Sequence, residues 1–259
     1  PKARLPLADV PLLNYSFELL ACNGVEEVYL FVNSHAKQVQ AYVDASDWGK
    51  RFHIQCIATS ACASAGEAMR WLDDNYKGLV KSDPFILLHG DVVSNMDLSP
   101  YIIAHQKRRK LRAENTMTMF LQEVGTSSAI RTFEEDLVVG VDDETKQVVY
   151  FSDDPELGLV NIPRRILEKH PAVTVHSDVV DACIYLCSPE VLWRFSESFD
   201  YTELRKGFIA MEVADLELGQ AVFAETLSTA SYAARCHDPR AYESICSDIL
   251  ARWVFPIVP

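Results

Sequence analysis

The stretch Phe85-Ile86-Leu87-Leu88-His89-Gly90-Asp91 decides the fold class of this chain. Its first four residues form an unbroken apolar run, which is typical of a strand buried on both faces of a parallel sheet. In an open α/β sheet, ligands bind beyond the carboxyl ends of the strands, which is where Asp91 would lie. Gly90 would let the backbone approach a ligand, and the Asp91 carboxylate would hold a divalent cation on phosphate oxygens. The alternative is that Gly90 and Asp91 only make the turn out of the strand.

The composition restricts the class of protein. A chain of 259 residues suits one large α/β domain or two small ones, and its 49% apolar content excludes wholesale disorder. The formal net charge of −13 disfavours a nucleic-acid-binding surface, which needs positive potential. Seven cysteines without a CxxC pair indicate free thiols in a reducing compartment. There is no apolar run of membrane-spanning length and no signal-peptide pattern at the opening. We expect a cytoplasmic protein that contacts neither nucleic acid nor membrane.

Apolar periodicity predicts alternating helices and strands. A helix is expected over residues 12–22, a buried strand over 28–32, a second helix around 39–43 and a second strand over 53–57. This order predicts a doubly wound, mostly parallel sheet. Farther along, the Val-rich arms within residues 137–151 predict a hairpin.

The small-residue loop that ends in Ser64-Ala65-Gly66-Glu67 is the second candidate site. Ser64 and Glu67 have the spacing of a capping box, so Glu67 is expected to tie down the N-terminus of a helix. The alternative is an anion site, because helix N-termini bind anions and small residues permit close approach.

Three other features favour structural interpretations. The basic run at residues 107–112 is predicted to be a solvated helix end that complements the helix dipole, with an acidic partner as the alternative. Cys183 and Cys187 are expected on one face of a strand, as buried thiols rather than a metal pair. The closing helix should carry Ile249 and Trp253 on its apolar face.

The sequence contains no GxSxG, HExxH, Walker A or GxGxxG motif, so the residues alone indicate no catalytic constellation. Three segments nevertheless resemble, in order, the nucleotidyltransferase family that makes nucleotide sugars. They correspond to the loop into its first long helix, its nucleobase turn and its metal-binding strand end, at residues 6–15 (PLADVPLLNY), 64–68 (SAGEA) and 88–91 (LHGD). The resemblance covers nearly the whole chain. It implies an α/β, Rossmann-like nucleotidyltransferase fold with a hairpin insertion.

A closer resemblance is to the epsilon-subunit family of eukaryotic translation initiation factor 2B, the guanine-nucleotide exchange factor for initiation factor 2. It is carried by residues 90–95 (GDVVSN), 187–191 (CSPEV), 199–201 (FDY) and 252–256 (RWVFP). In that family a nucleotidyltransferase-like domain precedes a left-handed β-helix and a C-terminal helical domain that carries exchange. The resemblance implies that residues 1–259 are the first domain, with 254–259 leading toward the β-helix.

The sequence departs from the enzyme family at its site. The family's glycine-rich phosphate loop would precede Pro1. Its catalytic lysine would fall near Lys2, but Ala3 stands where the family has proline. Glu67 replaces a threonine of the base-binding turn. The resemblance therefore implies no catalytic residue, no metal and no cofactor, and a vestigial nucleotide pocket formed by Gly66, Glu67, Gly90 and Asp91.

The resemblance also implies partners. The epsilon family carries an Asn-Phe pair, implicated in contact with initiation factor 2, where this sequence has Ser198 and Phe199. These two residues are the predicted partner-binding site, and the alternative is that Phe199 packs in the core. The other expected partners are the remaining subunits of factor 2B, above all the gamma subunit.

We therefore expect a non-catalytic scaffold and partner-binding domain of the exchange factor in translation initiation. One alternative is an active sugar-phosphate nucleotidyltransferase. A second is the gamma subunit of the same factor, which shares the first two domains. A third is a regulatory domain that binds nucleotide without turnover.

Overall fold

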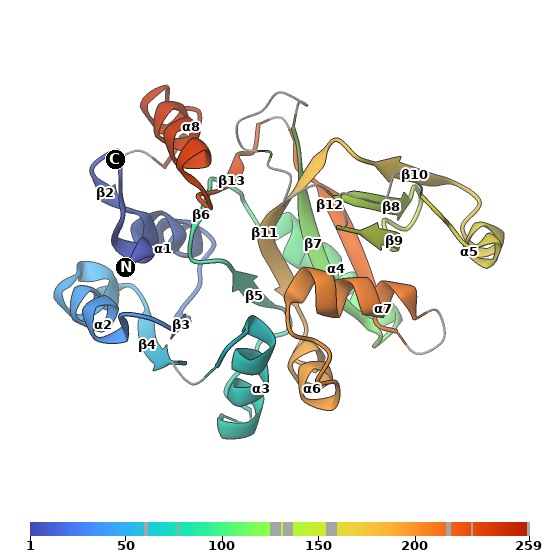
Figure 1. Ribbon diagram of the computed structural model, residues 1–259, viewed down its shortest axis with the longest axis horizontal. Helices are drawn as coiled ribbons and strands as arrows, with labels where there is room; N and C mark the ends of the chain where they lie inside the picture. The colour runs from blue at the N-terminus through green and yellow to red at the C-terminus, as the bar shows by residue number, and fades with distance from the viewer. Residues whose placement is uncertain are drawn as a thin grey trace.

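The computed structural model is of the α/β class, with helices packed around mixed sheets (Figure 1). It describes residues 1–59, 62–76, 78–124, 131, 137–153, 160–215, 219–228 and 230–257. Across these ranges, no helix has both the length and the apolar character needed to span a bilayer.

The N-terminal part has the predicted alternation of helices and strands. Strands β3 (Glu27–Val32) and β4 (His53–Ala58) pair in parallel, and α2 (Ala36–Ala45) connects them. Helix α1 (Leu12–Cys22) buries Leu13, Phe17 and Leu20 in the cluster that contains Val28 of β3, whereas Cys22, the last residue of the helix, is exposed. The short elements of this part are η1 (Lys2–Arg4), β1 (Pro6–Leu7), β2 (Val10–Pro11) and η2 (Asp47–Lys50).

The central sheet has the strand order β12-β7-β11-β5, formed by Ala221–Thr226, Asn115–Glu123, Val179–Cys187 and Phe85–Leu88. β12 runs parallel to β7, whereas β11 runs antiparallel to both β7 and β5. The predicted α/β class is confirmed, but the sheet is mixed. The expectation that β5 lies in a parallel sheet with both faces buried is wrong. Its residues are half-buried, because among the described strands β5 pairs on one side only.

A bulge in β11 divides its two cysteines between the faces of the sheet. Cys183 has a φ of 55°, and the register to β7 shifts between Asp181 and Tyr185. Cys183 therefore packs in the cluster that contains Leu186, whereas Cys187 packs in the one that contains Tyr185. Both thiols are buried as expected. The expectation that they share a face is wrong, because an extra residue in a strand resets its alternation.

The predicted hairpin is confirmed as β8 (Val138–Asp142) and β9 (Val148–Ser152), which pair antiparallel. β10 (Val173–His176) extends this small sheet on the other side of β8. The Asp142 carboxylate orders the hairpin turn, since its Oδ1 accepts hydrogen bonds from the backbone N–H of Thr145 at 2.6 Å and from the Thr145 hydroxyl at 2.8 Å. The Asp142 carboxylate is thus a buried acid that holds the turn together.

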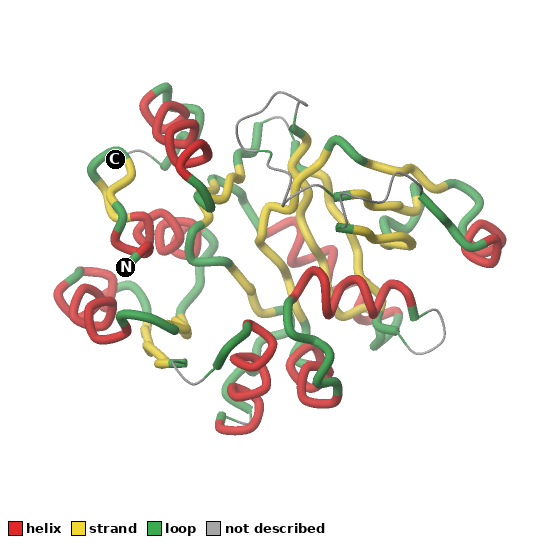
Figure 2. The backbone as a smooth tube through the Cα atoms, in the orientation of Figure 1, coloured by secondary structure: helices red, strands yellow, loops and turns green. Residues whose placement is uncertain are grey.

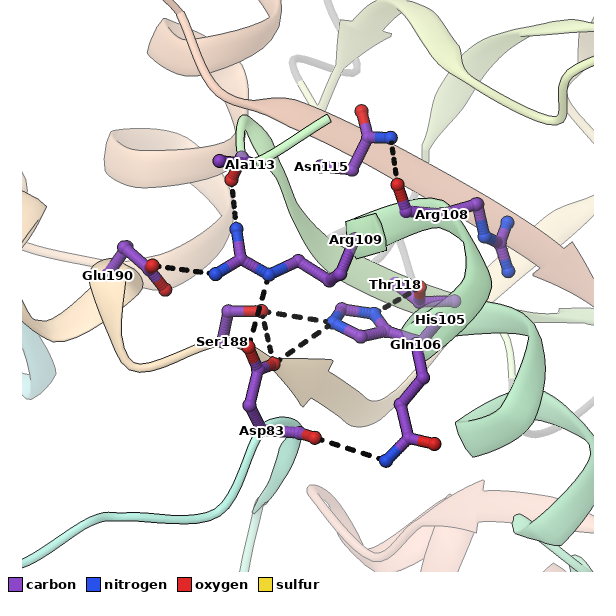
Figure 3. Close-up of polar contacts among 10 residues, drawn as sticks. All are labelled: Asp83, His105, Gln106, Arg108, Arg109, Ala113, Asn115, Thr118, Ser188 and Glu190. Atoms are coloured by element: carbon purple, nitrogen blue, oxygen red, sulfur yellow. Dashed lines mark hydrogen bonds and ion pairs between the residues drawn. The ribbon is translucent and has the colours of Figure 1, made fainter. Parts of the chain in front are cut away.

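Two arginines of the basic run form ion pairs between helix α4 (Ser99–Leu111) and acidic side chains outside the helix. Arg108 Nη2 donates to Glu225 Oε1 of β12 at 2.8 Å. Arg109 donates to Glu190 Oε1 at 2.6 Å and to Asp83 Oδ2 at 3.2 Å (Figure 3). The prediction of a solvated helix end is therefore wrong for these two side chains, which are mostly buried. It is confirmed for the exposed residues Lys107, Lys110 and Arg112.

Beside Arg109, a buried histidine joins α4 to two strands (Figure 3). His105 Nδ1 lies 3.0 Å from Thr118 Oγ1 of β7, and its Nε2 lies 3.1 Å from Ser188 Oγ at the end of β11. Ser188 donates its own proton to Asp83 Oδ1 at 2.7 Å, so His105 carries its proton on Nε2 and accepts at Nδ1. The fully buried Ser188 is no nucleophile, because the histidine does not accept its proton.

Helices α3 (Ala65–Asn75) and α6 (Glu190–Glu197) lie side by side (Figures 1 and 2). Ser196 Oγ donates to Asp73 Oδ2 across this contact at 2.7 Å. The remaining elements are β6 (Val92–Ser94), α5 (Arg164–Lys169), the π-helical turn η4 (Leu204–Ile209), α7 (Ala210–Ala214), β13 (Ala233–Arg235) and α8 (Pro239–Leu250).

The closing helix α8 is capped by Asp238, whose side chain accepts from the Ala241 N–H at 2.7 Å. Ile249 is buried, as expected for the apolar face. Trp253 is 72% exposed, so its predicted place on that face is wrong. The reason is that α8 ends at Leu250, and the turns that follow direct Trp253 away from the core.

Candidate functional site

The first candidate site is the carboxylate of Asp91, which follows β5 and precedes β6. Lys2 Nζ of η1 donates to Asp91 Oδ2 at 2.5 Å. Arg235 Nε of β13 donates to Asp91 Oδ1 at 3.0 Å. The antiparallel pairing of β13 with β6 places Arg235 there, opposite Val92. Three segments far apart in the sequence therefore converge on one carboxylate.

The electrostatics of this site favour an ionised carboxylate that already has its counter-charges. Burial raises the pKa of Asp91, but Arg235 and Lys2 outweigh it and hold the pKa below its usual value. A divalent cation would have to compete with these two cations for the same oxygens. Over the ranges that the structure describes, no group of three or more His, Cys, Asp or Glu side chains is arranged to hold a metal ion. The space beside Gly90 is open, since a Cβ there would meet no atom within 4 Å.

The second candidate site, at the start of α3, is occupied by backbone contacts. Ser64 Oγ accepts from the Glu67 N–H at 3.1 Å, and Glu67 Oε2 accepts from the Ala63 N–H at 2.6 Å. The capping interpretation of this turn is thereby confirmed. Gly66 permits a close approach, but to protein: a Cβ on Gly66 would lie 1.8 Å from the carbonyl oxygen of Tyr201.

The four predicted pocket residues therefore have different partners. Gly66 and Glu67 contact neighbouring backbone, and Gly66 donates its N–H to Thr202 O at 2.9 Å. Asp91 contacts Lys2 and Arg235 instead. Within the described ranges, no hydrogen bond or ion pair links the pair 66 and 67 to the pair 90 and 91.

The predicted partner-binding residues lie in a loop after α6. Phe199 is 79% exposed, which excludes the alternative that it packs in the core. Ser198 is half-buried, and its carbonyl accepts from Arg70 Nη1 at 3.3 Å. The Arg70 guanidinium also lies 5.5 Å from the centre of the Phe199 ring. The loop is thus exposed at its aromatic tip and held at its backbone.

Two residues of these sites were not predicted from the sequence. Arg235 is 144 positions from Asp91, and Arg70 is 125 to 131 positions from the carbonyls that it contacts. A polar residue on a helix or a short strand carries no local signal for a partner so distant. Only a contact prediction between these segments would have identified them.

The fold is similar to that of nucleotidyltransferases of known structure. It is similar to the solved structure of apo UDP-glucose pyrophosphorylase, with a TM-score of 0.67 and 14% identity over 97% of this chain and 91% of that one. This low identity shows the fold alone. No family model matches the chain.

Comparison with curated proteins is more specific. The chain is 36% identical over 265 residues to the translation initiation factor eIF2B subunit epsilon of Dictyostelium discoideum. It is also 36% identical over 263 residues to the subunit of that name from Schizosaccharomyces pombe. Both matches cover the whole chain, which spans 36% and 38% of the length of these two relatives. The resemblance to epsilon subunits that the motifs indicated is confirmed.

Proposed function

We propose that this chain is the scaffold and partner-binding domain of an epsilon subunit in the guanine-nucleotide exchange factor for translation initiation factor 2. The observation that carries the proposal is the 36% identity over the whole chain to two eIF2B epsilon subunits. On this proposal, residues 1–259 form the nucleotidyltransferase-like domain and 254–259 lead toward a β-helix. The protein acts in the cytoplasm, with exchange itself carried by another domain.

The proposal also holds that the domain is not a nucleotidyltransferase. Its support is the Asp91 carboxylate, whose two oxygens already accept from Lys2 and Arg235. Metal-assisted transfer needs cations on the reacting phosphates, and a carboxylate in two internal ion pairs is a poor ligand for them.

The partner surface on this proposal includes Ser198 and Phe199. An aromatic side chain exposed on a loop whose backbone is held in place suits an interface hot spot. Initiation factor 2 is the proposed ligand of this loop. The gamma subunit and the other subunits of factor 2B are the proposed partners of other faces.

The test uses the full-length protein that contains this chain, with purified initiation factor 2 loaded with labelled GDP. Phe199→Ala should weaken binding of initiation factor 2 at least tenfold, about 1.4 kcal/mol, with an unchanged Tm. Leu111→Ala is the matched control, because Leu111 is equally exposed (81%) but lies on α4. If Phe199→Ala and Leu111→Ala both bind like the unsubstituted protein, the proposed contact is wrong.

One observation favours a sugar-phosphate nucleotidyltransferase as the second candidate. Lys2, which the resemblance placed near the catalytic lysine of the enzymes, contacts Asp91. The two candidates are separated by incubating the protein with each nucleoside triphosphate, sugar 1-phosphates and Mg²⁺. We expect no pyrophosphate release above a boiled control. Steady release that Asp91→Asn abolishes would establish the enzyme instead.

A further inference from the structure

We propose that Arg70 is a positioning residue that holds the loop at residues 198–202 in its binding conformation, an inference that rests on the proposed function of Phe199. Arg70 lies on α3, whereas the loop follows α6, so this contact crosses between two helices. No sequence pattern marks Arg70, and its role follows from its contacts.

The guanidinium of Arg70 contacts three backbone carbonyl groups at and after the end of α6. Its Nη1 lies 3.4 Å from the carbonyl oxygen of Phe195, 3.3 Å from that of Ser198 and 3.2 Å from that of Tyr201. The last carbonyls of a helix have no partner within the helix, and a cation there complements the helix dipole. Arg70 therefore fixes the point at which the chain leaves α6.

The far end of the loop has further contacts besides the one that Arg70 makes with the Tyr201 carbonyl. Gly66 donates its N–H to Thr202 O at 2.9 Å. The Tyr201 ring packs edge-on against Phe195, and its hydroxyl donates to Glu212 Oε1 at 2.8 Å. The backbone is thus held on both sides of residues 199 and 200, which are themselves exposed.

The same guanidinium also limits the motion of the exposed ring. Arg70 Cζ lies 5.5 Å from the centre of the Phe199 ring, within the range of a cation–π contact. An exposed aromatic side chain otherwise samples several rotamers, and ordering it on binding lowers affinity. By holding the backbone and the ring together, Arg70 reduces this cost before the partner arrives.

This proposal makes Arg70 and Phe199 energetically coupled. In the full-length protein, Arg70→Ala should weaken binding of labelled initiation factor 2 roughly fivefold. The double variant Arg70→Ala/Phe199→Ala should bind about as weakly as Phe199→Ala alone, because the Phe199 ring is the main group that Arg70 positions. The matched control is Arg164→Ala, since Arg164 is 91% exposed on α5 and should leave binding unchanged.

Arg70→Lys separates positioning from folding. Lysine keeps the positive charge and most of the aliphatic stem, but it lacks the guanidinium, whose Nη1 contacts the carbonyls while its Cζ lies 5.5 Å from the centre of the Phe199 ring. We expect Arg70→Lys to bind initiation factor 2 more weakly than the unsubstituted protein does, at an unchanged Tm. If Arg70→Ala lowers the Tm, Arg70→Lys is the variant that tests the positioning role.

Three results would overturn the inference. The first is that Arg70→Ala and Arg70→Lys bind initiation factor 2 as tightly as the unsubstituted protein, while Phe199→Ala binds it more weakly. This result would leave the proposed function intact. The second is a double variant whose loss equals the product of the two single losses, because independent effects multiply. The third is unchanged binding of Phe199→Ala, which refutes the contact itself and therefore the proposed role of the loop.

Discussion

His105 should make the stability of this protein fall at mildly acidic pH. Its ring is 1% exposed, and both of its nitrogens contact hydroxyl groups. Burial lowers the pKa of His105 from its ordinary 6.5 to about 4; Asp83 opposes this, and Arg108 and Arg109 add to it. The folded protein therefore binds a proton at this ring less readily than the unfolded chain does.

The sign and size of the effect follow from that difference. Above pH 6.5 the His105 ring is mostly neutral in both the folded and the unfolded protein, so it does not lower the free energy of unfolding there. As the pH falls from 6.5 toward 4, the unfolded chain takes up the proton first and stability is lost. Because a tenfold change in proton affinity is worth about 1.4 kcal/mol, the complete loss is roughly 3 kcal/mol. About 2 kcal/mol of it should appear between pH 7 and pH 5.

The assay is urea unfolding of the chain and of His105→Gln at pH 7, 6 and 5. The glutamine side chain does not titrate, so the other titrating groups contribute equally to both proteins and cancel in the difference. His105→Gln should be the less stable protein at pH 7, because it disturbs the contacts with Thr118 and Ser188. The stability gap should narrow by about 2 kcal/mol at pH 5. A gap that stays constant from pH 7 to pH 5 would refute the assignment of a buried, neutral imidazole.

Two further predictions test the packing of the candidate site and of the closing helix. Gly66→Ala should destabilise the protein by about 1–3 kcal/mol, because its new Cβ would lie 1.8 Å from Tyr201 O. Gly49→Ala is the control and should be tolerated, since a Cβ there meets nothing within 4 Å. Equal Tm values for these two variants would contradict the close approach. Ile249→Ala should lower the free energy of unfolding by about 2–5 kcal/mol, because Ile249 is 1% exposed. Trp253→Ala should change it by less than about 0.5 kcal/mol, because Trp253 is 72% exposed. Urea titration of both variants checks this, and a large loss for Trp253→Ala alone would reverse the assignment.

Several features of the protein follow from the sequence by itself. Periodicity located helices and strands, including the hairpin of β8 and β9, because burial repeats every two or 3.6 residues within an element. The capping contact of Ser64 with Glu67 was predictable because its partners are three residues apart. The family resemblance also came from short segments, and it correctly placed Phe199 among the candidate surface residues.

The tertiary structure alone decided the direction of β5, the bulge at Cys183 and the partners of the functional residues. An apolar run has the same appearance beside a parallel or an antiparallel neighbour, so only the pairing with β11 determined its direction. The partners of Asp91 and Arg70 lie 89 to 144 residues away along the chain. Local patterns record whether a side chain is buried. Which distant group it meets depends on how the separate helices and strands pack, and that packing assembles the candidate site.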